Sequence, residues 1–230
     1  MAQATQLGAR RTTVDDIFDN LRDDILSLRL KPGDKISEAE VAAQFGVSRQ
    51  PVRDAFSRLS HLDLLLIRPQ RATVVKRFST RQIVKARFVR TAIEMEVLRR
   101  AADLCDTQGA DLLTTALAAQ EQAIKNADVE AFGALDYDFH ETLCQIAQAD
   151  FAFDVIMMEK SKVDRLCVLS LSKENRMPDL LEDHRAIAQA VTNHDPKKAV
   201  EVGRLHLARL DDTIERIAVT NANFFEPEGV

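Results

Sequence analysis

The sequence predicts a mainly helical protein, with an N-terminal winged helix-turn-helix followed by a C-terminal antiparallel bundle of six helices. The 230 residues contain only 7 glycines and 6 prolines, and apolar residues recur at helical spacing along most of the chain. A tight turn at Gly46 joins two short helices, and two β-prone runs follow them. We expect the boundary between a domain of residues 1–77 and a domain of residues 78–230.

The first predicted element is an amphipathic helix. Its apolar residues are related by helical spacing: Ile17, Leu21, Ile25 and Leu28. Pro32 and Gly33 follow as a turn, since proline cannot continue a helix and glycine permits a sharp change of direction.

The next two helices are joined by a sharp turn. The first ends at Gly46, because glycine tolerates the positive φ that an abrupt helix exit needs. Ser48 is placed to cap the second helix, and Pro51 lies in its first turn, where a missing N–H costs little.

The second of these helices has two different faces. Val52, Phe56 and Leu59 form an apolar stripe that anchors it to a core. The opposite face carries four polar residues: Arg49, Gln50, Arg53 and Ser57. Arginine can donate twice to guanine and glutamine can pair with adenine, so this face has the chemistry to enter a major groove. An ordinary helix hairpin with a solvated polar face would show a similar pattern.

A basic hairpin follows, with strands expected at Leu64–Ile67 and Thr73–Val75. Behind a helix-turn-helix such a hairpin is a wing, whose arginines can reach a phosphate or the minor groove. Through Arg77 the chain has 13 Lys and Arg against 10 Asp and Glu, and beyond it 18 against 26. A mildly basic head on an acidic body is typical of a DNA reader joined to a regulatory domain.

Beyond the linker, apolar periodicity predicts six helices. They cover roughly residues 80–104, 108–126, 128–148, 151–172, 178–193 and 196–220. Ser79 and Gln82 form a capping-box pattern, and Asp128 and Asp195 are placed as N-caps. The short connections favour antiparallel neighbours in a bundle.

Four side chains of the kinds that bind metals fall on the inward faces of three of these helices. Asp136 and His140 are four residues apart and share a face, while His184 and His206 lie on the apolar stripes of two other helices. One carboxylate and three imidazoles suit a divalent transition metal, zinc first, with nickel and manganese as alternatives. Each histidine could instead be a core residue with its own hydrogen bond.

The N-terminal part resembles the GntR family of bacterial transcription regulators, over roughly residues 14–77. The matching residues are Leu30 to Gly33, Ser37-Glu38, Phe45 to Arg49, Pro51 to Arg53 and the wing. The resemblance implies that the DNA contacts are Ser48, Arg49, Gln50, Arg53 and Arg71. Ala39, Asp63 and Ala72 stand where the family usually has an arginine, a helix-ending glycine and a wing glycine. Aspartate tolerates left-handed backbone, so Asp63 can still end the helix.

The C-terminal part is similar to the FCD effector domain of the FadR subfamily, in its VanR-type branch. The matching runs are Asp136 to His140, Asp183 to Ile187 and Arg204 to Leu207. The resemblance implies a metal at the floor of a pocket for a small carboxylate, with Arg90 or Arg165 as effector-binding residues that donate two hydrogen bonds. Arg90 could instead form an ordinary helical ion pair with Glu94.

These features predict a homodimeric, ligand-responsive transcription regulator, a repressor in most such families. It would bind a short palindromic double-stranded DNA operator and sense a small organic or sugar acid. A sensor for which the metal itself is the signal would use the same residues. A third hypothesis is a metalloenzyme with an accessory DNA-binding domain. No clear general base accompanies the metal-binding residues, so we expect no enzymatic activity.

We expect the protein to be cytoplasmic, without a membrane span. Cys105, Cys144 and Cys167 lack CxxC spacing, which favours reduced core thiols. The N-terminus has no apolar segment of the kind found in signal peptides, and the aliphatic run Leu64–Ile67 is too short to cross a bilayer.

Overall fold

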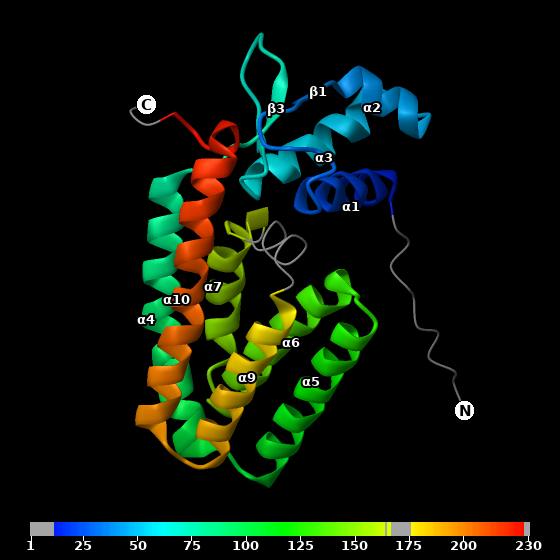
Figure 1. Cartoon of the computed structure of the whole chain (residues 1–230). Helices are drawn as coiled ribbons and strands as arrows, with labels where there is room; N and C mark the ends of the chain where they lie inside the picture. The colour runs from blue at the N-terminus through cyan, green and yellow to red at the C-terminus, as the bar shows by residue number, and fades with distance from the viewer. Residues whose placement is uncertain (1–11, 164, 167–175, 228–230) are drawn as a thin grey trace, which may run out of the picture. The chain divides into compact units, whose positions relative to one another are not determined.

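A computed structural model of the protein describes residues 12–163, 165–166 and 176–227, and the chain divides into two compact units (Figure 1). The first unit joins the chain up to Phe78 with the C-terminal segment from Asn223, and the second runs from Ser79 to Ala222. The described residues are mainly helical with one small antiparallel sheet, which confirms the predicted fold class.

The first unit contains three helices: α1 (Thr13–Leu26), α2 (Glu38–Phe45) and α3 (Arg49–His61). Leu28, which we expected in the first helix, lies beyond its end with a φ of 62°. Gly46 ends α2 with a φ of 65°, as the turn required. Asp63 follows α3 with a φ of 62°, so an aspartate takes the left-handed position that suits glycine.

The core of this unit fixes the orientation of α3. Val52, Phe56 and Leu59 are fully or almost fully buried against α1 and the sheet. Ser48 occupies the N-cap position as predicted, but its side chain makes no capping hydrogen bond. The apolar stripe therefore holds the helix, and its opposite face is left to solvent.

The sheet contains the predicted hairpin and one further strand. β2 (Leu65–Leu66) and β3 (Thr73–Val75) form the hairpin, and β1 (Lys35–Ile36) pairs with the other edge of β3. Two backbone hydrogen bonds extend this pairing: Gly33 N–H donates to the Val75 carbonyl and Val75 N–H to the Asp34 carbonyl, both at 2.8 Å. β1 is not predicted from the sequence, because its two residues are too few to show an alternating pattern.

The C-terminal segment is held in the first unit by backbone and aromatic contacts. Phe78 N–H donates to the Phe224 carbonyl and Glu226 N–H donates to the Phe78 carbonyl, both at 2.8 Å. The rings of Phe78 and Phe225 lie 5.4 Å apart, and Arg77 Nε donates to the Asn223 carbonyl. Phe78 thus lies two residues before the start of α4 and also holds the described C-terminal segment.

The second unit contains α4 (Thr80–Leu104), α5 (Thr107–Lys125), α6 (Val129–Ile146), α7 (Asp150–Ser161), α9 (Met177–Thr192) and α10 (Pro196–Thr220). Their bounds match the predicted helices closely, except that α7 ends at Ser161. The predicted continuation over 167–172 lies outside the described residues. None of the helices in the described ranges is both long and apolar enough to span a bilayer.

Sharp turns between these helices use left-handed residues other than glycine. Ala127, Gln148 and His194 have φ values of 54°, 51° and 53°. Asp128 and Asp195 cap α6 and α10 through their side chains, as predicted. The capping box predicted at Ser79 is wrong, because Ser79 makes no side-chain cap hydrogen bond.

A close approach of α4 and α10 depends on Gly203. The two helices lie side by side in Figure 1. A Cβ atom added at Gly203 would lie 2.1 Å from Leu98 Cδ1 and 3.2 Å from Met95 Cε. Any larger residue would therefore force Leu98 out of its place in the core.

Gly203→Ala should lower the free energy of unfolding, because the displaced Leu98 costs roughly 1–3 kcal/mol of overpacking, against roughly 1 kcal/mol of gained helix propensity. Gly133→Ala in α6 is the matched control, since its added Cβ would meet nothing within 4 Å, and it should stabilise the protein. Urea unfolding of both variants measures the difference. Equal stabilisation by the two substitutions would contradict the close approach.

Candidate functional site

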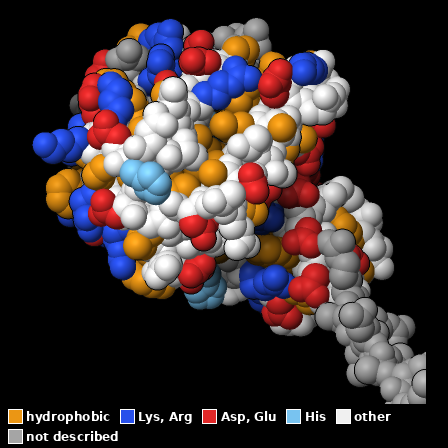
Figure 2. All heavy atoms as spheres, turned by 90° about the horizontal axis from the view of Figure 1, so that it is seen from below, with side chains coloured by type: hydrophobic (Ala, Val, Ile, Leu, Met, Phe, Trp, Pro, Cys, Tyr) orange, Lys and Arg blue, Asp and Glu red, His pale blue; other side chains and the backbone are white. Residues whose placement is uncertain are grey.

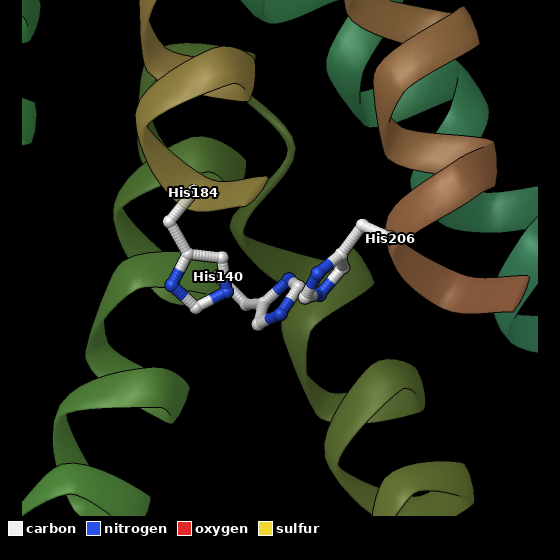
Figure 3. Close-up of side chains that lie close together, drawn as sticks. All are labelled: His140, His184 and His206. Atoms are coloured by element: carbon white, nitrogen blue, oxygen red, sulfur yellow. The ribbon is translucent and has the colours of Figure 1, made fainter. Parts of the chain in front are cut away.

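Three histidines from three helices converge inside the second unit. His140 comes from α6, His184 from α9 and His206 from α10, and their rings face one another in Figure 3. One ring nitrogen of each lies within 4.8 Å of the others. All three side chains are buried, His184 completely.

Each imidazole has an acceptor near its Nδ1 atom. His184 Nδ1 lies 2.8 Å from Gln120 Oε1, and His140 Nδ1 lies 3.1 Å from Glu94 Oε2. His206 Nδ1 is 3.5 Å from Asp183 Oδ2, a looser contact. In His184 and His140 these partners favour the tautomer with the proton on Nδ1, which leaves the Nε2 lone pair available. His206 Nδ1 makes no hydrogen bond among the described residues.

Gln120 is oriented by a second hydrogen bond. Its amide Nε2 donates to the Leu135 carbonyl at 3.0 Å, so its Oε1 atom is turned toward His184. The side chain is fully buried in α5. Gln120 therefore links α5 and α6 to the histidine of α9.

The Nε2 atoms of His140 and His184 are buried and find no hydrogen-bond partner among the described residues. A buried polar atom without a partner normally costs free energy. Burial and the neighbouring His206 also lower the pKa of His184 well below its ordinary value, which keeps this imidazole neutral. A neutral His184, two imidazoles whose Nδ1 atoms face acceptors, and ring nitrogens of all three histidines within 4.8 Å of one another fit a divalent transition metal. The alternative of isolated core histidines accounts for the Nδ1 contacts but not for these Nε2 atoms.

Asp136, the carboxylate expected in the metal set, lies beside the histidines but is shared with a lysine. Its Oδ1 atom is 3.4 Å from His184 Nε2, and its Oδ2 atom is 2.9 Å from Lys160 Nζ. Burial favours the neutral acid, but the Lys160 ammonium group outweighs it and holds the pKa of Asp136 below its ordinary value. The carboxylate is therefore ionised.

Arg90, which we expected to bind the effector, forms an ion pair with Glu94, the alternative that the sequence left open. Its Nε atom donates to Glu94 Oε1 at 2.7 Å, and both side chains are buried. Burial alone would raise the pKa of Glu94, but Arg90 and then His140 outweigh it, so the pKa lies well below its ordinary value. Glu94 thus connects Arg90 to the histidine cluster. Arg165, the other candidate, is buried just beyond α7.

A small cavity of about 10 Å³, roughly the room that one water molecule needs, lies next to the cluster. Its lining is mostly apolar and includes Glu94, Val97, Leu98, His140, Leu143, Ile156, Ile187, Gly203 and His206. Two of the three histidines therefore face an apolar space that is closed at one side by the α4–α10 contact. Neither Arg90 nor Arg165 is among the described residues that line this cavity.

The predicted DNA-binding residues lie at the surface of the first unit. Arg49, Gln50 and Arg53 are exposed on α3, Ser48 is exposed at its N-cap, and Arg71 is exposed at the hairpin tip. In this structure Arg53 Nη2 pairs with Glu38 Oε2 at 3.0 Å, and Gln50 Nε2 donates to Asp54 Oδ1 at 2.9 Å.

Four residues around the histidines were missed by the sequence analysis as parts of the site: Glu94, Gln120, Lys160 and Asp183. Gln120 had a usable signal, because it interrupts an apolar stripe of α5 at helical spacing from Leu113, Leu117 and Ile124. Asp183 directly precedes His184, but it contacts His206. Tertiary packing, rather than local spacing, brings Glu94 and Lys160 to the cluster.

Comparison with known proteins places both units in one family. Residues 4–75 match the gntR family of bacterial regulatory proteins, and residues 86–209 match the FCD domain. The chain is 35% identical over 228 residues to the HTH-type transcriptional repressor RspR of Escherichia coli strain K12, covering 99% of this chain and 100% of that protein.

Two further proteins are similar over most of their length. The gluconate operon transcriptional repressor of Bacillus subtilis strain 168 is 25% identical over 202 residues, covering 86% of this chain and 82% of that protein. The solved structure of E. coli McbR/YncC has a TM-score of 0.71 at 17% identity, over 90% of this chain and 99% of that chain, and so shares the fold. The chain therefore belongs to the gntR family of bacterial regulatory proteins, carries an FCD domain, and is a DNA-binding transcription regulator.

Proposed function

We propose that this regulator is a homodimeric repressor that senses a small organic or sugar acid at a metal-containing pocket in its FCD domain. The observation that carries the proposal is the convergence of three buried imidazoles, two of them with an acceptor close to Nδ1, beside a small, mostly apolar cavity. The repressor names of RspR and of the gluconate operon protein support the direction of regulation. The second of these names also supports a sugar acid as ligand.

His140, His184 and His206 would hold the metal, with Asp136 as a fourth ligand. Zinc suits three neutral imidazoles and one carboxylate, and nickel and manganese are alternatives. The bound metal would supply a Lewis-acidic position for a ligand oxygen. The remainder of the ligand would lie beside Leu98 and Leu143, where the small cavity would have to widen to admit it. Arg90 and Arg165 are proposed to add positive charge near the ligand's carboxylate.

The proposed dimer would cover apolar surface on two helices that pack against each other. α4 and α7 leave several large apolar side chains exposed: Val84, Phe88, Phe151, Val155 and Met158. Elsewhere, on the face that Figure 2 presents, acidic and basic side chains are interspersed with apolar ones. A two-fold pair of chains would present two α3 helices to a palindromic operator.

The route from the pocket to the DNA-binding unit would follow the chain itself. α10 carries His206 and leads directly into the segment from Asn223, which is held on Phe78. Phe78 in turn precedes α4, which carries Glu94. A change in the positions of α4 and α10 on ligand binding would thus bias the first unit through both of its connections, provided the ligand binds two states with different affinity.

DNA recognition by α3 is tested with Arg49→Ala and Arg53→Ala. Each should weaken operator binding by roughly 1–3 kcal/mol if the guanidinium reads a base. Fluorescence anisotropy with operator DNA measures the loss, and circular dichroism should stay unchanged because both side chains are exposed. Arg99→Ala, an exposed arginine of α4, is the control. Wild-type affinity in either α3 variant would contradict this placement of the recognition helix.

The metal site is tested by elemental analysis of protein purified without a histidine tag. We expect a bound transition metal, and chelation should lower the melting temperature because the metal ties α6, α9 and α10 together. His184→Ala and His206→Ala should each abolish the thermal shift on adding zinc, whereas His61→Ala, an exposed histidine of α3, should keep it. A wild-type protein without metal, and without a shift from zinc, nickel or manganese, would reduce the cluster to core hydrogen-bonding groups.

The proposed route along the chain is tested by hydrogen exchange of Phe225→Ala. Zinc added to the wild-type protein should slow exchange at the Phe78 and Glu226 amides as well as in the bundle. Phe225→Ala removes the ring contact with Phe78, so zinc should then protect the bundle alone. Val219→Ala, at an exposed position of α10, is the control. Protection of both amides that persists in Phe225→Ala would contradict the route.

A further inference from the structure

Gln120 is a fully buried side chain on α5, a helix that carries none of the three histidines. Its two amide ends contact two other helices. The Nε2 atom donates to the Leu135 carbonyl of α6 at 3.0 Å, and the Oε1 atom lies 2.8 Å from His184 Nδ1 of α9. A buried amide is costly unless it is hydrogen-bonded, and both ends of this one have a partner.

The Leu135 carbonyl determines which end of the Gln120 amide faces His184. A carbonyl oxygen only accepts hydrogen bonds, so the amide must turn its NH2 group toward it. The opposite orientation of the amide would place Gln120 Oε1 against the Leu135 oxygen, with two acceptors in contact and no proton between them. His184 Nδ1 therefore faces an oxygen atom, to which it can only donate.

His184 has a second acceptor near its other nitrogen. Asp136 Oδ1 is 3.4 Å from His184 Nε2, although this contact lacks the geometry of a hydrogen bond. An imidazole that binds a metal must be neutral, and a neutral imidazole carries one proton. If that proton were on Nε2, it would be attracted by the carboxylate and would occupy the lone pair that a metal needs.

Gln120 opposes this second tautomer. With the proton on Nε2, the Nδ1 lone pair would face Gln120 Oε1, and turning the amide would only move the conflict to the Leu135 carbonyl. The His184 ring also stacks on Phe139, with 4.3 Å between the ring centres and 19° between the planes, which fixes the plane of the ring. Gln120 and Asp136 thus compete for one proton, and the closer contact is the one with Gln120.

We propose that Gln120 is a positioning residue of the metal site, which holds the single proton of His184 on Nδ1 against the attraction of Asp136. The Nε2 atom of His184 is thereby kept open for the metal. This inference rests on the proposed function, because it requires a metal at the three histidines. It adds α5 to the helices on which metal binding depends, although α5 supplies no ligand.

The tautomer is measured in the metal-free protein by long-range proton–nitrogen NMR correlations of isotope-labelled histidine, with His184→Ala to assign the signals. The wild-type protein should carry the His184 proton on Nδ1. Gln120→Met keeps an unbranched side chain and removes the acceptor, so the proton should move to Nε2, beside Asp136. Zinc competition titrations should then show roughly 10- to 100-fold weaker binding, because the metal must first displace that proton.

Two further variants separate the acceptor from the packing of the side chain. Gln120→Glu should keep the wild-type tautomer, because a carboxyl group offers an oxygen to His184 Nδ1 whether or not it is ionised. Gln122→Met is the matched control, since Gln122 lies on the same helix, is exposed and pairs with Asn126. It should keep both the tautomer and the zinc affinity of the wild-type protein.

A His184 proton on Nε2 in the wild-type protein or in Gln120→Glu would overturn the inference. So would a Gln120→Met variant that keeps the proton on Nδ1, or that loses zinc affinity without a change of tautomer, since Gln120 would then act only through packing. Should Gln120→Met fail to fold, the wild-type and Gln120→Glu spectra decide. A wild-type protein with the proton on Nδ1 that binds no zinc would overturn the proposed metal site, and with it the role of Gln120 there, while the tautomer itself stands.

Discussion

The fully buried imidazole of His184 constrains the whole of the second unit. Its Nδ1 atom is held by Gln120 from α5, and its Nε2 atom faces His140, His206 and Asp136 from α6 and α10. A polar ring at such a place must have both nitrogens satisfied, or folding loses free energy. Gln120 satisfies one nitrogen through the protein, and in our proposal a metal satisfies the other. Four helices are thereby held in fixed relation to a single ring.

Close packing and short turns in the rest of the bundle hold these helices in place around His184. Gly203 lets α10 approach α4 closely enough for His206 to reach the cluster. The turns at Ala127, Gln148 and His194 keep neighbouring helices antiparallel without extra loop length. In the first unit an apolar stripe fixes α3, and its polar face is free to meet DNA. The two units are joined where the chain passes Phe78 and where it returns to it.

Much of this could be predicted from the sequence, because its strongest signals are local. The histidines were found since each falls on an apolar stripe, and the α2–α3 turn since Gly46 marks it. Strand β1 was missed because two residues carry no periodicity, and α7 was expected to extend past Ser161 because its apolar spacing continues. The contacts made around the histidine cluster by Glu94 and Lys160 depend on which helices pack together. The sequence shows Asp136 and Lys160 24 positions apart, and only the fold makes them partners.

The central claim is that one metal ion is bound by His140, His184 and His206. Anomalous diffraction from crystals of the zinc-loaded protein, collected on both sides of the zinc absorption edge, tests it most directly. We expect one strong peak per chain at roughly 2.0–2.1 Å from a nitrogen of each ring, with the Nδ1 atoms of His140 and His184 still facing Glu94 and Gln120. A peak elsewhere, or none within coordinating distance of the three rings, would contradict it.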